Sequence, residues 1–177
     1  MSMSDFVVFV LLGMCLLGNS CVDRLSKNVV ASRCEARWYA TPSENQRCYD
    51  LQTQFAEAAW EGDIERMKKS IENGANVNGG AYQSLSALTA AASQGHDGAV
   101  LFLIQSGASI NRVEGVGNTA LKSAVANGRK RTIEILLENG ANICENTESS
   151  ALQYAIESDS AEVIDMLIRA GAKECEK

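Results

Sequence analysis

The chain has 177 residues, enough for one domain with a hydrophobic core and a short extension. Its formal net charge is −6, from 16 basic and 22 acidic residues. Because nucleic-acid binding needs clustered Lys and Arg against the phosphates, this balance argues against a nucleic-acid partner. The one basic cluster, Arg129-Lys130-Arg131, is followed by Glu134, and we interpret it as a solvated helix end.

An apolar run of twelve residues, Phe6 to Leu17, stands at the start and is followed by Gly18-Asn19-Ser20-Cys21. Twelve residues fit the core of a signal peptide and fall short of the about 20 that span a bilayer. Small residues ahead of Cys21 resemble a bacterial lipoprotein cleavage site, so Cys21 is a candidate for lipidation. Asn19 fits that pattern poorly, and the basic residues follow the run instead of preceding it. Residues 1–20 are therefore a signal peptide or, alternatively, an uncleaved anchor with the rest of the chain on the cytoplasmic side.

Residues 21–50 form an extension that contains one clear helix signal. Thr41-Pro42-Ser43-Glu44 is a capping box with Pro at the first helical position. The helix is expected to run towards Leu51 and to lead into the segment that follows. We interpret the extension as a helical cap over an apolar domain end, with Trp38 and Tyr39 buried in it.

The remainder, residues 51–177, is repetitive. A Gly-Ala pair recurs at Gly74, Gly107, Gly140 and Gly171, at spacings of 33, 33 and 31 residues, and an apolar run precedes each pair. A fixed period between 20 and 50 residues indicates a solenoid. The repeats are expected at about 51–78, 79–111, 112–144 and 145–177.

Each repeat reads as two helices and a loop. In the second repeat, Ser86 is expected to cap an Ala-rich helix that ends at Gln94, and Gly95-His96 forms the turn. Asp97 begins a second, apolar helix, which Gly107 ends in the left-handed conformation. Since no repeat can bury its apolar face alone, stability is expected to come from stacking.

These repeats resemble the ankyrin repeat family across roughly residues 51–177. The resemblance is carried by Thr119-Ala120-Leu121 with Ala124 and Gly128, and by the segment from Leu136 to Ile143. The family's Pro is replaced at the helix starts, and its His becomes Thr89, Lys122 or Gln153. The resemblance implies an all-α helix-turn-helix solenoid with short β-hairpin-like loops and, in this chain, an N-terminal helical cap.

It also implies a non-enzymatic module that binds a protein partner on a concave face lined by loop tips and first helices. By register, the loop candidates are Tyr82, Gln83, Leu85, Val113, Glu114, Val116, Asn118, Glu148 and Ser149. The helix candidates are Trp60, Glu61, Ser93, Gln94, Ala126, Asn127, Glu157 and Ser158. Trp60 and Tyr82 rank first because aromatic anchors dominate interface energetics. An equal alternative for Trp60 is packing against the extension.

Catalytic patterns are missing from the sequence. It has a single His, His96, in a turn where ankyrin repeats place a structural hydrogen-bonding residue, and no nucleophile elbow, phosphate loop or metal-ligand spacing. We therefore expect no catalytic residues, no metal and no cofactor. The protein is expected to be a monomer that contacts a membrane only through its leader or a lipid.

Four cysteines remain once Cys15 leaves with the leader and Cys21 carries lipid. We predict a Cys34–Cys48 disulfide that ties the extension to the stack, and a Cys144–Cys175 disulfide between equivalent loop positions. The even number favours export, so the leading hypothesis is a binding module of the cell envelope, periplasmic or lipid-anchored. The alternatives are an envelope factor that protects, assembles or inhibits one enzyme, and a cytoplasmic-facing membrane adaptor.

Overall fold

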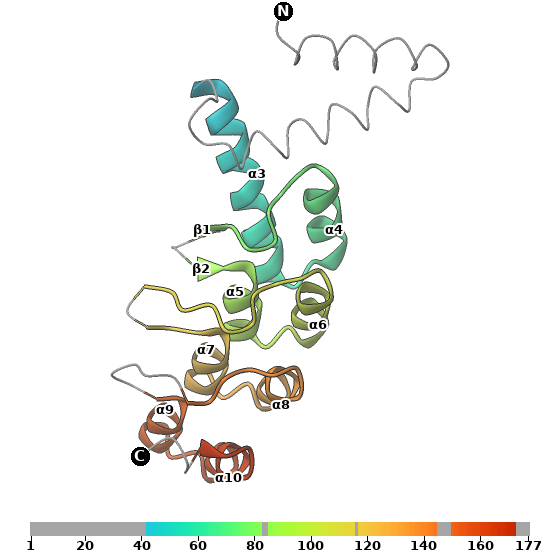
Figure 1. Cartoon of the computed structure of the whole chain (residues 1–177). Coiled ribbons are helices and arrows are strands. Elements are labelled where there is room, and N and C mark those ends of the chain that lie inside the picture. Colours follow the sequence, from blue (N-terminus) through green and yellow to red (C-terminus); the bar gives the residue numbers. More distant parts are fainter. Residues whose placement is uncertain (1–41, 83–84, 116, 145–149, 173–177) are drawn as a thin grey trace, which may run out of the picture.

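Short helices in pairs follow one another along the chain in this computed structural model, which describes residues 42–82, 85–115, 117–144 and 150–172. The first helices of the pairs are α3 (Pro42–Glu61), α5 (Ala87–Gln94), α7 (Ala120–Ala126) and α9 (Ala151–Glu157). The second helices are α4 (Ile64–Glu72), α6 (Asp97–Gln105), α8 (Lys130–Glu138) and α10 (Ala161–Arg169). The two sets form two parallel columns in Figure 1.

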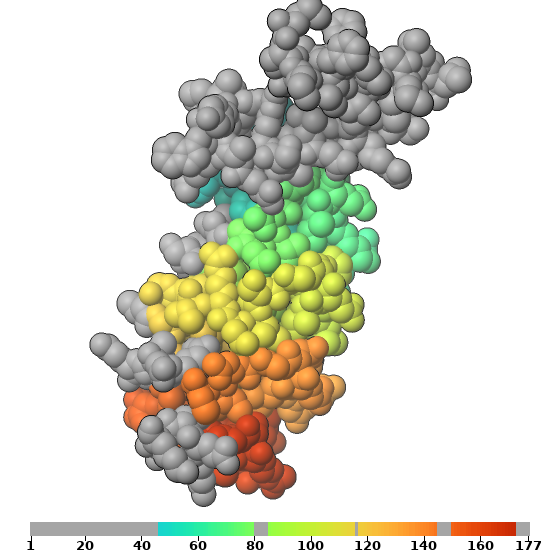
Figure 2. All heavy atoms as spheres, viewed as in Figure 1, coloured from blue at the N-terminus to red at the C-terminus, as the bar shows by residue number. Residues whose placement is uncertain are grey.

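Stacking relates each pair to the next. Helix α3 packs on α5, α5 on α7 and α7 on α9, while α4 packs on α6 and α6 on α8. Figure 2 shows the described residues as successive layers of an elongated body, coloured in chain order from cyan to red. The predicted all-α helix-turn-helix solenoid is confirmed.

The helix starts follow the predicted capping chemistry. The hydroxyl of Ser86 accepts a hydrogen bond from the backbone N–H of Thr89 at the start of α5. At the starts of α7 and α9, the hydroxyls of Thr119 and Ser150 likewise accept from the N–H three residues further along the chain. Each side chain satisfies one of the N–H groups that a helix leaves open at its start. After α6, Gly107 has φ +88°, the left-handed conformation predicted for it.

The loops between repeats form small hairpins. Strands β1 (Gly80–Tyr82) and β2 (Leu85–Ser86) pair antiparallel, with Gly80 opposite Ser86 and Tyr82 opposite Leu85. One repeat later, a single antiparallel bridge joins Glu114 to Asn118. These are the β-hairpin-like loops expected from the resemblance, and they project on the side of the first helices (Figure 1).

One hydrophobic cluster runs through all four layers. Alanines of the first helices, such as Ala59, Ala91 and Ala124, are fully buried, which lets neighbouring first helices approach closely. Larger side chains, including Leu103 on α6 and Leu136 on α8, fill the space beside them. The core is therefore shared between repeats, as stacking stabilisation requires.

Helix α3 differs from the expected extension helix. It begins at Pro42 as predicted, but it passes Leu51 without a break and ends at Glu61. The boundary predicted between residues 50 and 51 therefore falls inside one helix, which serves both as the end of the extension and as the first helix of repeat one. The leader, Cys21, Cys34, Trp38 and Tyr39 lie outside the described residues.

Candidate protein-binding surface

The C-terminal ends of the four first helices form a series, here called the helix-end row. Its members are the eight helix candidates, Trp60, Glu61, Ser93, Gln94, Ala126, Asn127, Glu157 and Ser158. Glu61, Ala126, Asn127, Glu157 and Ser158 are exposed, and Trp60 and Gln94 are half-buried. Because the first helices stack on one another, the row places one pair of side chains per layer along a continuous surface.

Ser93 is the exception in this row. It is only 8% exposed, its hydroxyl donates to the carbonyl oxygen of Ala90 at 2.8 Å, and its own carbonyl accepts from Nε of Arg129 at 3.0 Å. The expectation that Ser93 is displayed to a partner is therefore wrong. Arg129 comes from the next repeat and packs over Gly95, where an added Cβ would lie 2.8 Å from its Cδ, and the sequence pattern did not indicate this contact.

The basic cluster also differs from its interpretation as a solvated helix end. Arg129 is half-buried and joins two repeats, and Lys130 forms an ion pair with Glu162 of the following repeat. Only Arg131 is paired within its own helix, and the hydrogen bond and negative charge of Glu134 raise the pKa of its guanidinium. The cluster connects three layers and offers little free positive charge.

The loop candidates fall into two groups. Leu85 is half-buried in β2, Asn118 is half-buried with its amide nitrogen donating to the Ser123 hydroxyl at 2.8 Å, and Val113 is 54% exposed. The backbone of Tyr82 pairs with that of Leu85. The Tyr82 side chain, Gln83, Val116, Glu148 and Ser149 lie outside what the structure describes.

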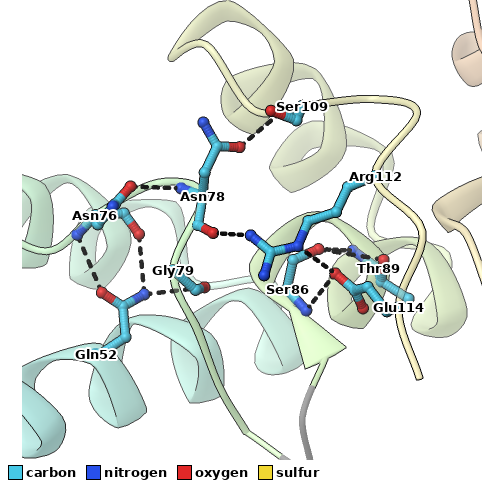
Figure 3. Close-up of polar contacts among 9 residues, drawn as sticks. All are labelled: Gln52, Asn76, Asn78, Gly79, Ser86, Thr89, Ser109, Arg112 and Glu114. Carbon is cyan, nitrogen blue, oxygen red and sulfur yellow. Dashed lines mark hydrogen bonds and ion pairs between the residues drawn. The ribbon is translucent and has the colours of Figure 1, made fainter.

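Glu114 has a structural role and is not displayed at a loop tip, contrary to expectation. It is 6% exposed, and its Oε1 accepts the backbone N–H of Ser86 at 2.8 Å and lies 3.5 Å from Nε of Arg112 (Figure 3). Ser86 is the residue that caps α5, so Glu114 fixes the start of a helix in the preceding repeat. Among the described residues, Oε2 of Glu114 has no hydrogen-bond partner.

Asparagine side chains connect consecutive loops in a repeating way. The amide of Asn78 donates to the carbonyl oxygen of Gly107 at 3.1 Å and accepts from the backbone N–H of Ser109 at 2.7 Å (Figure 3 shows the second contact). Asn111 makes the same two contacts with Gly140 and Asn142, at 3.1 and 2.7 Å. The recurrence of Asn four residues after the repeat glycine was the sequence signal for this clamp.

Gln52 supplies the corresponding contacts at the N-terminal end. Its amide nitrogen donates to the carbonyl oxygens of Asn76 and Gly79, and its amide oxygen accepts from the N–H of Asn76 (Figure 3). Arg112 adds a hydrogen bond to the carbonyl oxygen of Asn78. The loops between repeats, which lead into the N-terminal ends of the first helices, are therefore held in register from α3 onwards.

His96, the single histidine of the sequence, has a structural position. Nε2 of His96 lies 3.0 Å from the carbonyl oxygen of Trp60, which confirms its interpretation as a structural hydrogen-bonding residue. The contact joins the second repeat to the first, which the sequence did not indicate. In the described ranges, no three His, Cys, Asp or Glu side chains come together as a metal site would require. None of the described helices combines the length and apolar character needed to cross a bilayer.

Cys48 on α3 and Cys144 after α8 are each disulfide-bonded. Cys144 stands at the register position that Asn78 and Asn111 occupy in the two preceding repeats. Their predicted partners, Cys34 and Cys175, lie outside the described residues, so the two pairings stay predictions.

The stacked helix pairs, the projecting hairpins and the shared core define a helical repeat protein with an extended surface. The chain matches the family model for ankyrin repeats (3 copies) over residues 55–147 and 117–177, which together cover more than half of it. It belongs to the ankyrin repeat family, whose repeats form protein–protein interaction modules. No curated protein shows significant similarity to the chain.

Proposed function

We propose that this ankyrin repeat module is exported to the cell envelope and holds one protein partner against the helix-end row and the loops between repeats. The observation that carries the proposal is the side-chain composition of that surface. Between the half-buried Trp60 and the exposed Asn127 it offers an aromatic ring and polar groups on first helices that neighbouring layers hold in place. A surface that is already ordered loses little conformational entropy when a partner binds.

Charge also favours this side over the opposite one. The exposed surface of the second helices carries side chains that are already paired with each other, including Lys68 with Glu65 and Lys130 with Glu162. Exposed ion pairs of this kind contribute little free energy, and charges at an interface add association rate and specificity more than affinity. The eight residues of the helix-end row include two charged ones, Glu61 and Glu157, and Glu61 is paired with Arg66 of α4. The aromatic member of the row, Trp60, lies at its N-terminal end.

Export is supported by the leader and by the cysteines. Phe6 to Leu17 has the length of a signal-peptide core, and Cys21 follows it at a lipoprotein-like cleavage site. Disulfide bonds at Cys48 and Cys144 are compatible with an oxidising compartment such as the periplasm and with few cytosolic proteins. Location in the envelope and lipidation of Cys21 both belong to the proposal.

The surface is tested by covalent capture. A photo-crosslinking amino acid placed at Ala126, which is exposed in the centre of the row, is expected to capture one partner at a fixed mass in the native cell. The same label at Leu101, on the outer side of α6 and 38% exposed, is the matched control. Equal capture at both positions, or capture at Leu101 alone, would contradict binding on the helix-end row.

Trp60 and Tyr82 are tested once the captured partner is purified. Replacement of either by Ala is expected to weaken binding at least about tenfold while the thermal midpoint of unfolding stays near that of the wild type. A large drop in the midpoint with unchanged affinity would assign the side chain to packing. If the partner is an enzyme whose activity falls when this protein is removed, the module acts as an assembly or protection factor.

The leader is tested by N-terminal sequencing and intact mass of the mature protein. A start at Cys21 with the mass of a lipid attached supports an anchored lipoprotein of the envelope. A start at Met1 would instead support the adaptor on an uncleaved anchor. Non-reducing mass spectrometry of the same sample tests Cys34–Cys48 and Cys144–Cys175, and free thiols at all four positions would exclude both.

A further inference from the structure

Two recurring hydrogen-bonded connections join consecutive repeats, and the joint between the third and fourth repeats is built differently. In the first connection, the residue after the turn glycine reaches a first-helix carbonyl oxygen of the preceding repeat, as His96 and Arg129 do at 3.0 Å. The fourth repeat has Ser160 at this register position. Its side chain is shorter, and within the described residues it makes no hydrogen bond to α7.

The second connection is the asparagine clamp between loops. Asn78 and Asn111 each bind the loop of the next repeat through a side-chain amide that both donates and accepts a hydrogen bond. Cys144 takes this register position in the third repeat, and it is disulfide-bonded. Its predicted partner, Cys175, belongs to the sequence of the fourth repeat and lies outside the described residues. This pairing would place a covalent bond where the earlier joints have an amide clamp.

Noncovalent support for the fourth repeat is weak in the described part of the chain. Lys130 pairs with Glu162 across the joint, but the two side chains are 51% and 64% exposed, and exposed pairs contribute little free energy. Asp159 has φ +50° at the turn position that glycine holds in the other three repeats, a conformation that disfavours a residue with a Cβ. Ile164 of α10 is half-buried, whereas its counterpart Ile133 of α8 is fully buried. The fourth repeat therefore depends on apolar contacts with the third repeat and on the disulfide.

We propose that the disulfide of Cys144, formed with Cys175, holds the fourth repeat on the third, and that its reduction releases α9 and α10 while the first three repeats stay folded. A dithiol reductant supplies two electrons and two protons to this bond. The S–S bond breaks, Cys144 and Cys175 become thiols, and the reductant is oxidised to a disulfide. Because each repeat contacts only its neighbours, a repeat at the end of the stack can open without the others.

Release of the fourth repeat would shorten the helix-end row. Glu157 and Ser158, at the end of α9, are the last pair of side chains in that row, and both are exposed. The row of the reduced protein then extends over three layers, at one end of the stack in Figure 1. A partner that contacts all four layers is therefore bound more weakly after reduction. This consequence rests on the proposed function, whereas the release itself does not.

The release is tested by hydrogen–deuterium exchange of the purified full chain with and without dithiothreitol, a dithiol, followed by mass spectrometry of its peptides. Peptides that cover residues 151–169 are expected to exchange at least about tenfold faster after reduction. Peptides that cover residues 87–105, in the second repeat, are expected to keep their rate. The reductant also opens the disulfide at Cys48, but that residue lies on α3 at the opposite end of the stack.

Two substitutions of Cys144 separate the disulfide from the clamp that it replaces. Cys144→Ser is expected to show the fast exchange over residues 151–169 without reductant and no further response to it. Cys144→Asn returns the amide that Asn78 and Asn111 carry at this register position, where Gly171 corresponds to Gly107 and Gly140. It is expected to slow the exchange again, equally with and without reductant.

Three results would overturn the proposal. The first is unchanged exchange of residues 151–169 on reduction of the wild type, a measurement that stands alone if Cys144→Ser does not fold. The second is an equal increase over residues 87–105, because the whole stack would then open together. The third is the same fast exchange in Cys144→Ser and Cys144→Asn, since the disulfide would then not take the place of a clamp. These measurements need no partner, so a failure of capture at Ala126 leaves them unaffected.

Discussion

Nε of Arg129 donates to the carbonyl oxygen of Ser93 at 3.0 Å, and the hydrogen bond crosses from one repeat to the one before it. Nε2 of His96 makes the equivalent contact with the carbonyl oxygen of Trp60, also at 3.0 Å. In both cases the side chain follows the turn glycine and reaches the last part of the preceding first helix. Two chemically different side chains therefore perform the same connection at consecutive interfaces.

Replacing Arg129 by Ala is expected to lower the free energy of unfolding by about 1–2 kcal/mol, since the hydrogen bond to a buried carbonyl and the cover over Gly95 are both lost. Urea unfolding followed by circular dichroism measures the change. Arg131→Ala is the control, because Arg131 is exposed and pairs only with Glu134 in its own helix. Equal losses in the two variants would show that the contact to Ser93 contributes nothing of its own.

Gly62 tests how closely the first two repeats approach. It has φ +75°, and a Cβ added there would lie 2.7 Å from Cγ of His96. Gly62→Ala is therefore expected to destabilise the fold by more than the about 1–2 kcal/mol that a left-handed alanine costs. Gly140→Ala provides the comparison, because Gly140 has φ +87° and nothing within 4 Å of the added Cβ. If the two variants lower the thermal unfolding midpoint equally, the contact between residue 62 and His96 adds nothing to the cost of the substitution.

Two leucines of α6 allow the stability contribution of a buried side chain to be compared with that of an exposed one. Leu103 is fully buried and Leu101 is 38% exposed, two residues apart on the same helix. Leu103→Ala is expected to reduce the free energy of unfolding by about 2–5 kcal/mol, because a buried cavity remains. Leu101→Ala is expected to change it by less than about 1 kcal/mol. A comparable loss for the two substitutions would contradict the position of α6 in the stack.

Glu114 and its neighbour Val113 distinguish a structural from a binding role in one loop. Glu114→Ala removes the acceptor for the Ser86 N–H and is expected to cost about 1–3 kcal/mol of stability. Val113 is 54% exposed, and Val113→Ala is expected to leave the unfolding midpoint unchanged. Stability of Glu114→Ala equal to that of the wild type would restore Glu114 as a candidate for partner contact.

The sequence alone predicts the parts of this fold that depend on local chemistry. Ser86 and Thr119 cap helices because their hydroxyls accept hydrogen bonds from N–H groups that are open at a helix start. Gly107 adopts a left-handed conformation that other residues avoid. Capping residues and turn glycines therefore recur at fixed intervals in the sequence. Contacts between repeats are harder to predict. Glu114 is polar and lies in a loop, which favours exposure, but the preceding repeat offers it an N–H that only the stacked structure brings within reach.

The length of α3 escaped prediction for a related reason. Its sequence contains a start signal at Pro42 but no stop signal before Gly62, and the change from extension to repeat is not marked by a turn residue. Arg129 shows the opposite case. Its position in a cluster of basic residues suggests a solvated side chain, but Nε of Arg129 donates to the carbonyl oxygen of Ser93 in the preceding repeat. Such assignments depend on which surfaces meet, and one sequence does not specify that.

The unbroken course of α3 has a mechanical consequence for whatever the N-terminal segment is attached to. The part of α3 between Pro42 and Leu51 is about 15 Å long at the rise of an α-helix, and it is continuous with a helix wedged into the first layer. A force or a torque applied at Pro42 is therefore transmitted to the stack through a continuous helix, without a flexible joint between them. A partner bound to the repeats would therefore keep a fixed orientation relative to the N-terminal end of α3, which a flexible linker would not give.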